Sequence, residues 1–390
     1  MDHFTETSHT GFLENIGNSF KGILFGFLLL AGSIYLLSYN EHRSINQTLA
    51  LEEMQSKIIT LENTNYNAQY EKSPVLLQGE VLPKKELEDR LFGIKSNGLV
   101  LERNVEMYQW VEHTSSKSED KLGGGTETVT TYDYKKEWSS STVDSSSFRY
   151  SSGHENTSMA YHRESFSTDA NLGDFYLSKN IIKHFSNRES FNGLTKMPEK
   201  IGEMKNYKSY LYKGSNPEHP LIGDIKISYK EAGQGFYSLA GMVQGKALVP
   251  YISENDKNLF FVRVAKVSAH QIFKEEFDAN TLLTWVLRAV GLMLMFFGFM
   301  LIMGPLETLA NVIPMLGSVI GGASALVAGV LTLLLGSLVI AIAWFASRPL
   351  LSLTIIGVGI GLTFILKSFK KDKESAFSSQ STPPPRRNKD

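Results

Sequence analysis

The sequence contains no cysteine among its 390 residues. This absence excludes disulfide bonds, thiolate nucleophiles, iron–sulfur clusters and cysteine-based zinc sites. The chain also lacks an excess of either charge, because 39 basic residues stand against 40 acidic ones and the formal net charge is −1. A nucleic-acid-binding surface that depends on a strong positive charge is therefore not expected.

Charge is scarce in one long part of the chain and abundant in another. Residues 282–366 contain only three charged side chains, those of Arg288, Glu307 and Arg348. Residues 40–281, by contrast, carry most of the Lys, Arg, Asp and Glu of the chain. The overall composition is thus an average of a membrane-like part and a water-soluble part.

Four apolar runs approach the roughly 20 residues that a helix needs to cross a hydrocarbon core. These predicted spans are residues 22–39, 282–303, 320–345 and 350–366. The first run favours a retained anchor over a signal peptide, because only Lys21 precedes it closely and no small-residue cleavage site follows. We expect residues 304–319 to form a cytoplasmic-side interfacial segment. Residues 346–349, which include Pro349, are expected to form an outer turn.

The predicted orientation depends on the basic tail. Residues 367–390 place several lysines directly after the last run, which is typical of a cytoplasmic segment, and their composition predicts disorder. Four spans would then leave residues 1–21 in the cytoplasm and residues 40–281 outside it. The sequence therefore predicts an integral membrane protein with a large extracytoplasmic region.

The large region shows both helical and strand-like patterns. Residues 47–59, 84–92 and 180–185 are predicted helices, whereas residues 104–113 and 126–138 alternate with period two and are rich in β-branched and aromatic side chains. The latter two segments predict a long antiparallel hairpin. The expected fold class is a multi-pass α-helical membrane protein of four spans, with a mixed α+β extracytoplasmic domain between spans one and two.

No motif of a catalytic, cofactor or metal site stands out. The nine histidines form neither an HExxH pattern nor an i,i+4 pair, and no G-x-S-x-G elbow occurs. The glycines at 123–125 do not belong to a phosphate-binding GxxxxGK[ST] loop and predict a turn. We therefore expect no enzyme activity, no cofactor and no metal.

Charged residues are costly inside a membrane span, so those in and near the predicted spans are candidates for a functional role. Arg288 follows Trp285 inside the second run, and Arg348 follows the third. Their side chains either snorkel to the interface or form an outer-leaflet anchor. As an anchor they would bind lipid phosphate or the acidic residues Glu275, Glu276 and Asp278.

Small residues recur at four-residue spacing in the predicted spans, a pattern that lets helix backbones approach closely. In the last two spans they are Gly317, Gly321, Ala325, Gly329, Gly357 and Gly361, and in the first they are Gly22 and Gly26. We favour packing within one chain over packing between copies.

Several sequence blocks, in order along nearly the whole chain, resemble the transmembrane protein 43 (LUMA) family. Among them are RNVEMYQWVE at 103–112, YDYKKEW at 132–138 and TWVLRAVG at 284–291. The motif residues of the outer domain are Glu106, Met107, Tyr108, Trp110, Tyr132, Tyr134 and Trp138.

This resemblance implies a membrane organiser. Eukaryotic members of the family reside in the endoplasmic reticulum and inner nuclear membrane, self-associate, and associate with emerin and lamins. The lack of cysteine favours a bacterial inner-membrane member with a periplasmic loop. A eukaryotic member would have a lumenal loop instead. Nothing in this sequence matches a motif for lamins or emerin.

We therefore expect a non-enzymatic scaffold that forms homo-oligomers and contacts membrane lipids and other membrane proteins, but no nucleic acid. The alternatives are a channel or transporter component and an extracytoplasmic enzyme acting on lipid or an envelope polymer.

Overall fold

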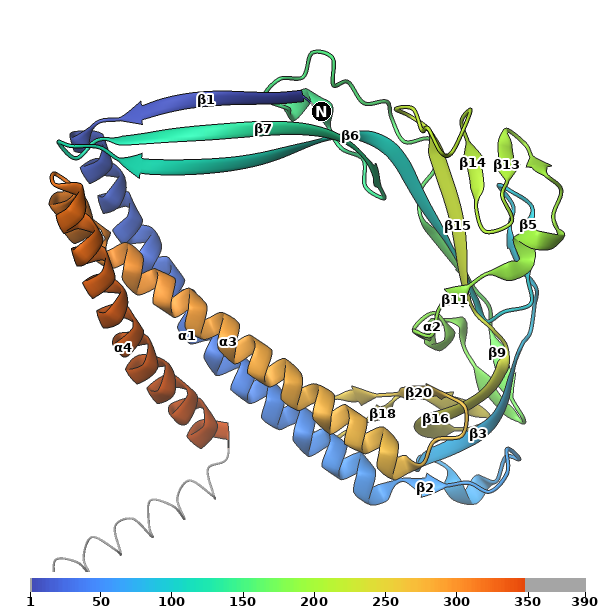
Figure 1. Ribbon diagram of the computed structural model, residues 1–390. Helices are drawn as coiled ribbons and strands as arrows, with labels where there is room; N and C mark the ends of the chain where they lie inside the picture. The colour runs from blue at the N-terminus through green and yellow to red at the C-terminus, as the bar shows by residue number, and fades with distance from the viewer. Residues whose placement is uncertain (1, 348–390) are drawn as a thin grey trace, which may run out of the picture.

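A computed structural model describes residues 2–347 of the protein. Three long helices dominate one side of it: α1 (Phe12–Lys57), α3 (Ala269–Ala310) and α4 (Pro314–Ser347). Each is long and apolar enough to cross a membrane. In Figure 1, α1 and α3 run side by side along most of their length, and α4 packs on their outer side.

The predicted fold class is wrong. Among the described residues there are three candidate membrane helices, and the part between the first two is β-rich, not mixed α+β. We call residues 58–268 the β-rich region, and within it the one α-helix described is α2 (Lys179–Ile182). The predicted fourth span, residues 350–366, lies outside the described residues, as does the tail at 367–390.

The helices extend past the apolar runs that predicted them. The predicted helix at 47–59 is the polar end of α1, and most of the predicted interfacial segment at 304–319 belongs to α3 and α4. Pro314 begins α4, a position where proline's missing N–H costs no helical hydrogen bond. The turn between α3 and α4 is therefore only a few residues long.

A nine-stranded sheet forms the far side of the molecule, opposite the helices (Figure 1). Its main strands, in spatial order, are β1 (Asp2–Thr10), β7 (Thr126–Ser139), β6 (Val100–Asp120), β15 (Ile225–Ala232), β14 (Leu211–Lys213), β13 (Met204–Asn206) and β12 (Lys200–Ile201). At the side, β8 (Glu164–Ser167) pairs with β6, and β11 (Glu189–Ser190) pairs with β15.

A seven-stranded sheet lies near the C-terminal end of α1. Its strands, in spatial order, are β2 (Ile59–Thr60), β3 (Pro74–Pro83), β9 (Ala170–Leu172), β10 (Phe175–Leu177), β17 (Ala247–Val249), β16 (Gly235–Gln244) and β20 (Phe261–Val264). Two short hairpins join β4 (Leu87–Asp89) to β5 (Ile94–Ser96), and β18 (Tyr251–Ile252) to β19 (Asn258–Leu259). The helix predicted at 84–92 is replaced by β4 and a turn, because Leu87 and Asp89 are buried on alternate positions.

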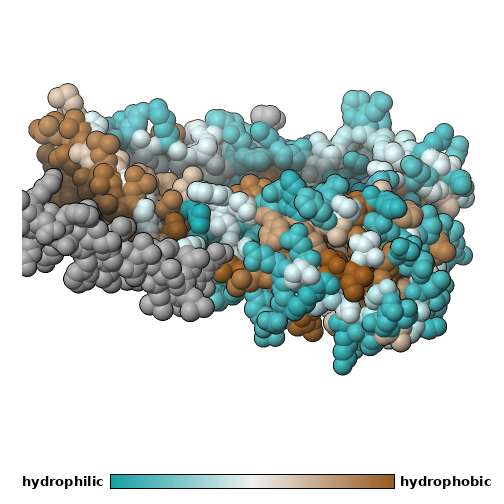
Figure 2. Space-filling model, turned by 90° about the horizontal axis from the view of Figure 1, so that it is seen from below, coloured by the Kyte–Doolittle hydropathy of each residue, from teal (hydrophilic) through white to brown (hydrophobic). Residues whose placement is uncertain are grey.

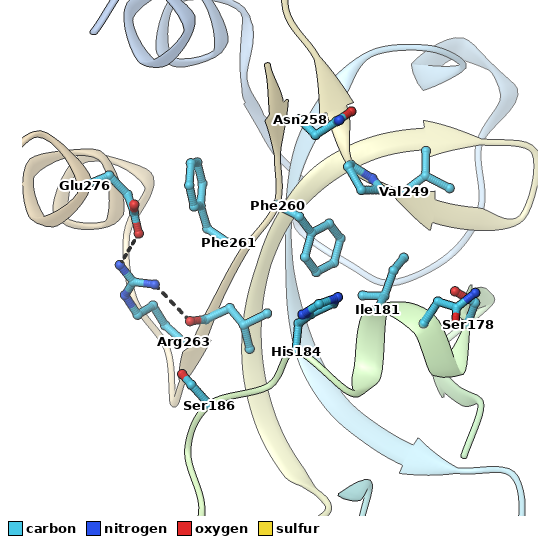
Figure 3. A pocket seen from close by; sticks show the side chains of 13 residues that line it. Ser178, Ile181, His184, Ser186, Val249, Asn258, Phe260, Phe261, Arg263 and Glu276 are labelled. Carbon is cyan, nitrogen blue, oxygen red and sulfur yellow. Dashed lines mark hydrogen bonds and ion pairs between the residues drawn. The ribbon is translucent and has the colours of Figure 1, made fainter. Parts of the chain in front are cut away.

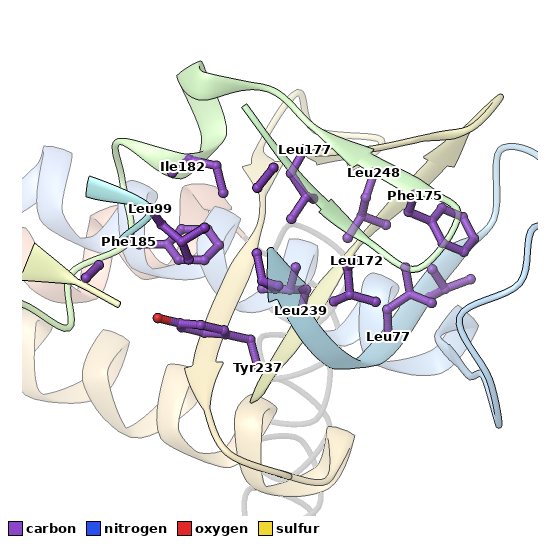
Figure 4. Close-up of a cluster of buried hydrophobic side chains, with 14 of the residues drawn as sticks. Leu77, Leu99, Leu172, Phe175, Leu177, Ile182, Phe185, Tyr237, Leu239 and Leu248 are labelled. Atoms are coloured by element: carbon purple, nitrogen blue, oxygen red, sulfur yellow. The ribbon is translucent and has the colours of Figure 1, made fainter. Parts of the chain in front are cut away.

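Separate hydrophobic clusters stabilise these parts. The largest lies under the seven-stranded sheet, where Leu77, Phe175, Phe185 and Leu239 from different elements meet (Figure 4). Another hydrophobic cluster joins the C-terminal end of α1 and the N-terminal end of α3 to β3 and β16.

On the surface shown in Figure 2, apolar residues gather over the helical end of the molecule, whereas the β-rich end is mostly hydrophilic.

The predicted hairpin is present and is longer than expected. Strands β6 and β7 pair from Met107↔Ser139 to Asp120↔Thr126. The N-terminal strand β1, which the sequence did not predict, pairs along β7 from Asp2↔Tyr134 to Thr10↔Thr126. Residues from the very start of the chain therefore belong to the same sheet as the hairpin.

Candidate functional site at the membrane junction

A buried ion pair ties α1 to α3 where the apolar runs end. The Nε of Arg288 donates to Oε1 of Glu41 at 2.6 Å, and its Nη2 donates to Oε2 at 2.8 Å. The side chain of Glu41 is 2% exposed and that of Arg288 is 22% exposed. This bidentate geometry fixes the relative register of the two helices. The ring centroid of the exposed Trp285 lies 4.8 Å from the guanidinium carbon of Arg288.

A ladder of polar contacts continues from this pair toward the β-rich region. Asn40 donates to the carbonyl of Thr284 at 3.0 Å, and Arg43 donates to the side chains of Asn280 and Thr284, each at 3.0 Å. Asn280 in turn donates to Oγ1 of Thr48 at 3.1 Å. We call residues 40–48 and 280–288 the membrane junction. These contacts join α1 to α3 and fix the position of one helix against the other.

The sequence pointed to Arg288 but missed its partner. Glu41 directly follows an apolar run, where a charged residue is normally just a flank, so no local pattern marked it. The acidic run proposed for Arg288 has other partners. Arg263 contacts Glu275 and Glu276, each at 2.7 Å, and Lys274 contacts Asp278 at 2.9 Å. Arg348 lies outside the described residues.

The small residues pack mainly within the chain. A Cβ at Gly317 or Gly321 would collide with the side chain of Asn311 or Glu307, respectively, whereas one at Gly329 would meet open space. The remaining members of the predicted pattern are Ala325, which is half-buried, and Gly357 and Gly361, which lie outside the described residues.

The backbones of α1 and α3 approach each other closely at a pair of glycines. A Cβ at Gly26 would lie 2.7 Å from the carbonyl oxygen of Gly298. The backbones can approach this closely only because neither residue has a side chain.

We expect Gly26→Ala to destabilise the protein by about 1–3 kcal/mol, because the added methyl would force the two backbones apart. The matched control is Gly32→Ala in the same helix, where a Cβ would meet nothing within 4 Å. Thermal unfolding in mild detergent would measure both variants. Equal midpoints for the two variants would contradict the close approach.

The motif residues of the hairpin form two aromatic groups. Tyr134 is fully buried and stacks on His154 with ring centroids 4.0 Å apart, and the edge of Trp110 contacts the same ring at 4.8 Å. Tyr108 packs against Trp138 at 5.3 Å. The other motif residues have different partners. Met107 lies in a buried hydrophobic cluster, and Glu106 forms an ion pair with Lys226 at 3.3 Å. The ring centroids of Tyr132 and Tyr150 are 5.9 Å apart.

A second buried ion pair holds the base of the hairpin. Nη1 of Arg103 donates to both carboxylate oxygens of Asp89, at 2.8 and 2.7 Å, and Nη2 donates to Glu164 at 2.8 Å. The hydroxyl of Tyr229 also donates to Asp89 at 2.7 Å. Burial, together with this hydrogen bond, raises the pKa of Tyr229 well above its usual value. The hydroxyl of Tyr229 therefore stays protonated and donates its hydrogen bond to the carboxylate of Asp89.

The tip of the hairpin lies at the opposite end of the helices from the junction. Asn15 donates to the carbonyl of Gly124 at 3.0 Å, and the backbone N–H of Gly123 donates to the carbonyl of Val312 at 3.1 Å. Asn311 donates to Asp120 at 2.9 Å. At 1.5 Å per residue, the helix from residue 15 to 41 is about 39 Å long. The hairpin therefore meets the helices at its tip, and in Figure 1 it diverges from α1 and α3 toward its base.

A pocket of about 700 Å³ opens between α2 and β20. Figure 3 shows His184 and Phe260 lining it, with the guanidinium of Arg263 directed toward Glu276. The charge of Arg263 is already matched within the chain by Glu275 and Glu276. No cluster of three metal-ligating side chains occurs in the part of the chain that the structure describes.

Comparisons with known proteins identify relatives along most of the chain. A family model described as transmembrane protein 43 matches residues 107–349. The chain is 29% identical over 368 residues to transmembrane protein 43 of Homo sapiens, covering 91% of each. It is also 29% identical to the homolog from Drosophila melanogaster over 293 residues, which is 73% of this chain and 77% of the relative. No solved structure matches the chain.

Proposed function

Since the chain belongs to the transmembrane protein 43 family, we propose that it is a non-enzymatic membrane scaffold that self-associates and contacts lipid. The observation that carries this proposal is the continuity of α1 and α3 with the β-rich region. Both helices pass from the apolar runs into a shared core, where Leu51, Met54 and Phe273 are fully buried. A scaffold needs such fixed geometry between its membrane anchor and its outer surface.

Lipid contact is supported by an apolar pocket between α3 and α4. Trp285, Arg288, Leu292 and Trp344 are among its lining residues. An acyl chain fits such a lining, and an exposed tryptophan beside an arginine is typical of the headgroup level. We therefore place the interface of the bilayer near the membrane junction.

The protein is an integral membrane protein. Its placement in a bacterial inner membrane, with the β-rich region in the periplasm, stays a prediction. The corresponding prediction for a eukaryotic member is the endoplasmic reticulum and inner nuclear membrane. The orientation predicted from four spans and the basic tail depends on residues 350–390, which lie outside the described residues, and it stays a prediction.

Native mass spectrometry of the full chain in mild detergent tests self-association. We expect assemblies of two or more copies that retain bound lipid. A strictly monomeric, lipid-free particle would contradict the scaffold proposal.

A channel component is the second candidate, and the polar hairpin that contacts the membrane helices at its tip is what favours it. Flux of small ions into proteoliposomes containing the protein would support this alternative. Impermeable vesicles would exclude it and leave the scaffold proposal intact.

A further inference from the structure

The hairpin and β1 form a polar sheet that meets the apolar helices at its tip and diverges from them toward its base (Figure 1). The turn of the hairpin contacts the α3–α4 turn at one end, while Arg103 anchors its base in the β-rich region at the other. We call residues 2–10, 112–120 and 126–134 the polar sheet. Nine residues of strand are about 27 Å long, close to the roughly 30 Å of a hydrocarbon core. The polar sheet, tethered at its tip to the end of the membrane helices, is therefore long enough to cross the same layer.

The side chains of this sheet are unsuited to lipid on either face. Residues 114–120 are all exposed, and six of the seven are Ser, Lys, Glu or Asp. The facing strand contributes a run of Thr with Glu127 and Asp133, and β1 contributes Glu6, His3 and His9. Such residues cannot face hydrocarbon, so the sheet must be surrounded by water or protein.

Both outer edges of the sheet have free backbone groups. In an antiparallel ladder, alternate residues direct their N–H and C=O to the same side. On β6, Tyr108 and Trp110 direct theirs away from β7, where they bond to Asp224 and Asn156. The same alternation continues along residues 112–120, where the described residues provide no further backbone partner. On β1 the outward residues are the odd-numbered ones, from His3 to His9.

The two free edges match each other. Tyr134 of β7 is paired with Asp2 on one side and Glu112 on the other, and Thr126 is paired with Thr10 and Asp120. The edges of β1 and β6 thus have equal length, begin and end at the same level, and run in the same direction. A copy related by rotation about an axis along the strands would place its β1 beside this β6.

We propose that β1 of one copy pairs in parallel with residues 112–120 of β6 in the next copy, closing the polar sheets into a ring inside the helices. This inference deepens the proposed scaffold function and depends on its self-association. The contact is heterologous, and because the copies are related by rotation about an axis along the strands, successive copies can close into a ring. The ring satisfies every edge, as a structure at bilayer depth requires. The helices, with α4 outermost, then face the lipid.

Cysteine cross-linking of the full chain in its membrane tests the pairing directly, because the native sequence supplies no competing thiol. We would combine Thr5→Cys with Thr114→Cys, Ser116→Cys or Ser118→Cys, which samples neighbouring registers. Cα atoms of adjacent strands lie within the range that a disulfide bridges. Oxidation is expected to produce a ladder of multimers for at least one pair. Each single variant, and the off-edge pair of Thr5→Cys with Leu221→Cys, should give no ladder.

The outcomes separate this proposal from the scaffold proposal. Oligomers by native mass spectrometry without any ladder would overturn the edge pairing and leave the scaffold intact, whereas a monomer would overturn both.

Labelling with a membrane-impermeant maleimide tests separately whether the polar sheet crosses the membrane. Leu122→Cys at the tip and Leu221→Cys in the β-rich region, both exposed, should be labelled from opposite sides. Labelling from the same side would overturn the crossing of the sheet.

A proline variant tests the edge without a new thiol. Thr7→Pro removes an N–H that points away from β7, so the chain should fold and remain monomeric. Ser8→Pro removes an N–H on the β7 side and should instead loosen β1. Undiminished oligomers in Thr7→Pro would contradict the proposed interface.

Discussion

Replacing Glu41 with alanine is expected to reduce the free energy of unfolding by about 3–5 kcal/mol, because it leaves Arg288 without its carboxylate in a largely buried site. The two hydrogen bonds of 2.6 and 2.8 Å would both be lost. Since this pair fixes the register of α1 against α3, we also expect residues 40–48 of α1 to separate more readily from α3. Thermal unfolding and hydrogen exchange at residues 40–48 would measure the two effects.

Two further variants isolate the cause. Glu52→Ala removes an exposed carboxylate from the same helix and should change the unfolding midpoint very little. The double variant Glu41→Leu with Arg288→Leu removes both charges and should recover much of the lost stability, because well-packed apolar residues often replace a buried pair without cost. A double variant as unstable as Glu41→Ala would show that packing, not the unpaired charge, is responsible.

Asp89→Ala is expected to have a comparable effect, about 3–5 kcal/mol, on the β-rich region. It would leave Arg103 facing only Glu164 and would remove the acceptor of Tyr229. Because this group anchors the base of β6, limited proteolysis is expected to cut the hairpin faster.

The neighbouring Glu88→Ala is the control for Asp89. Glu88 is exposed and lies 3.8 Å from Arg90, and such a surface pair contributes only about 0–1 kcal/mol. Equal proteolysis of the two variants would contradict the anchoring role of Asp89.

Local patterns in the sequence predicted the parts of the fold that depend on local chemistry. Three of the predicted apolar runs lie in helices, and the period-two alternation near Met107 and Tyr134 predicted the hairpin. The family resemblance was confirmed by the match over residues 107–349. Each of these features depends on residues that lie close together in the sequence.

The features that the sequence did not predict depend on partners far along the chain. Glu41 and Arg288 are 247 residues apart, and no pattern around either residue indicates the other. The sequence predicted only a cytoplasmic segment at residues 1–21 and no strand there, because the pairing partner of β1 lies more than a hundred residues later. The short strands between residues 164 and 213 lack the length that makes an alternation visible, so the region seemed richer in helix than it is.

The position of β1 also has a consequence for the order of synthesis. The strand is made before α1, yet its partner β7 is made only after α1 and residues 58–125. Helix α1 can enter the membrane while residues 2–10 still lack a partner, so the polar sheet is completed late, by a contact of high sequence separation. A substitution that weakens the pairing of β1 with β7, such as Ser8→Pro, would therefore interfere with the last step of assembly, not with membrane insertion.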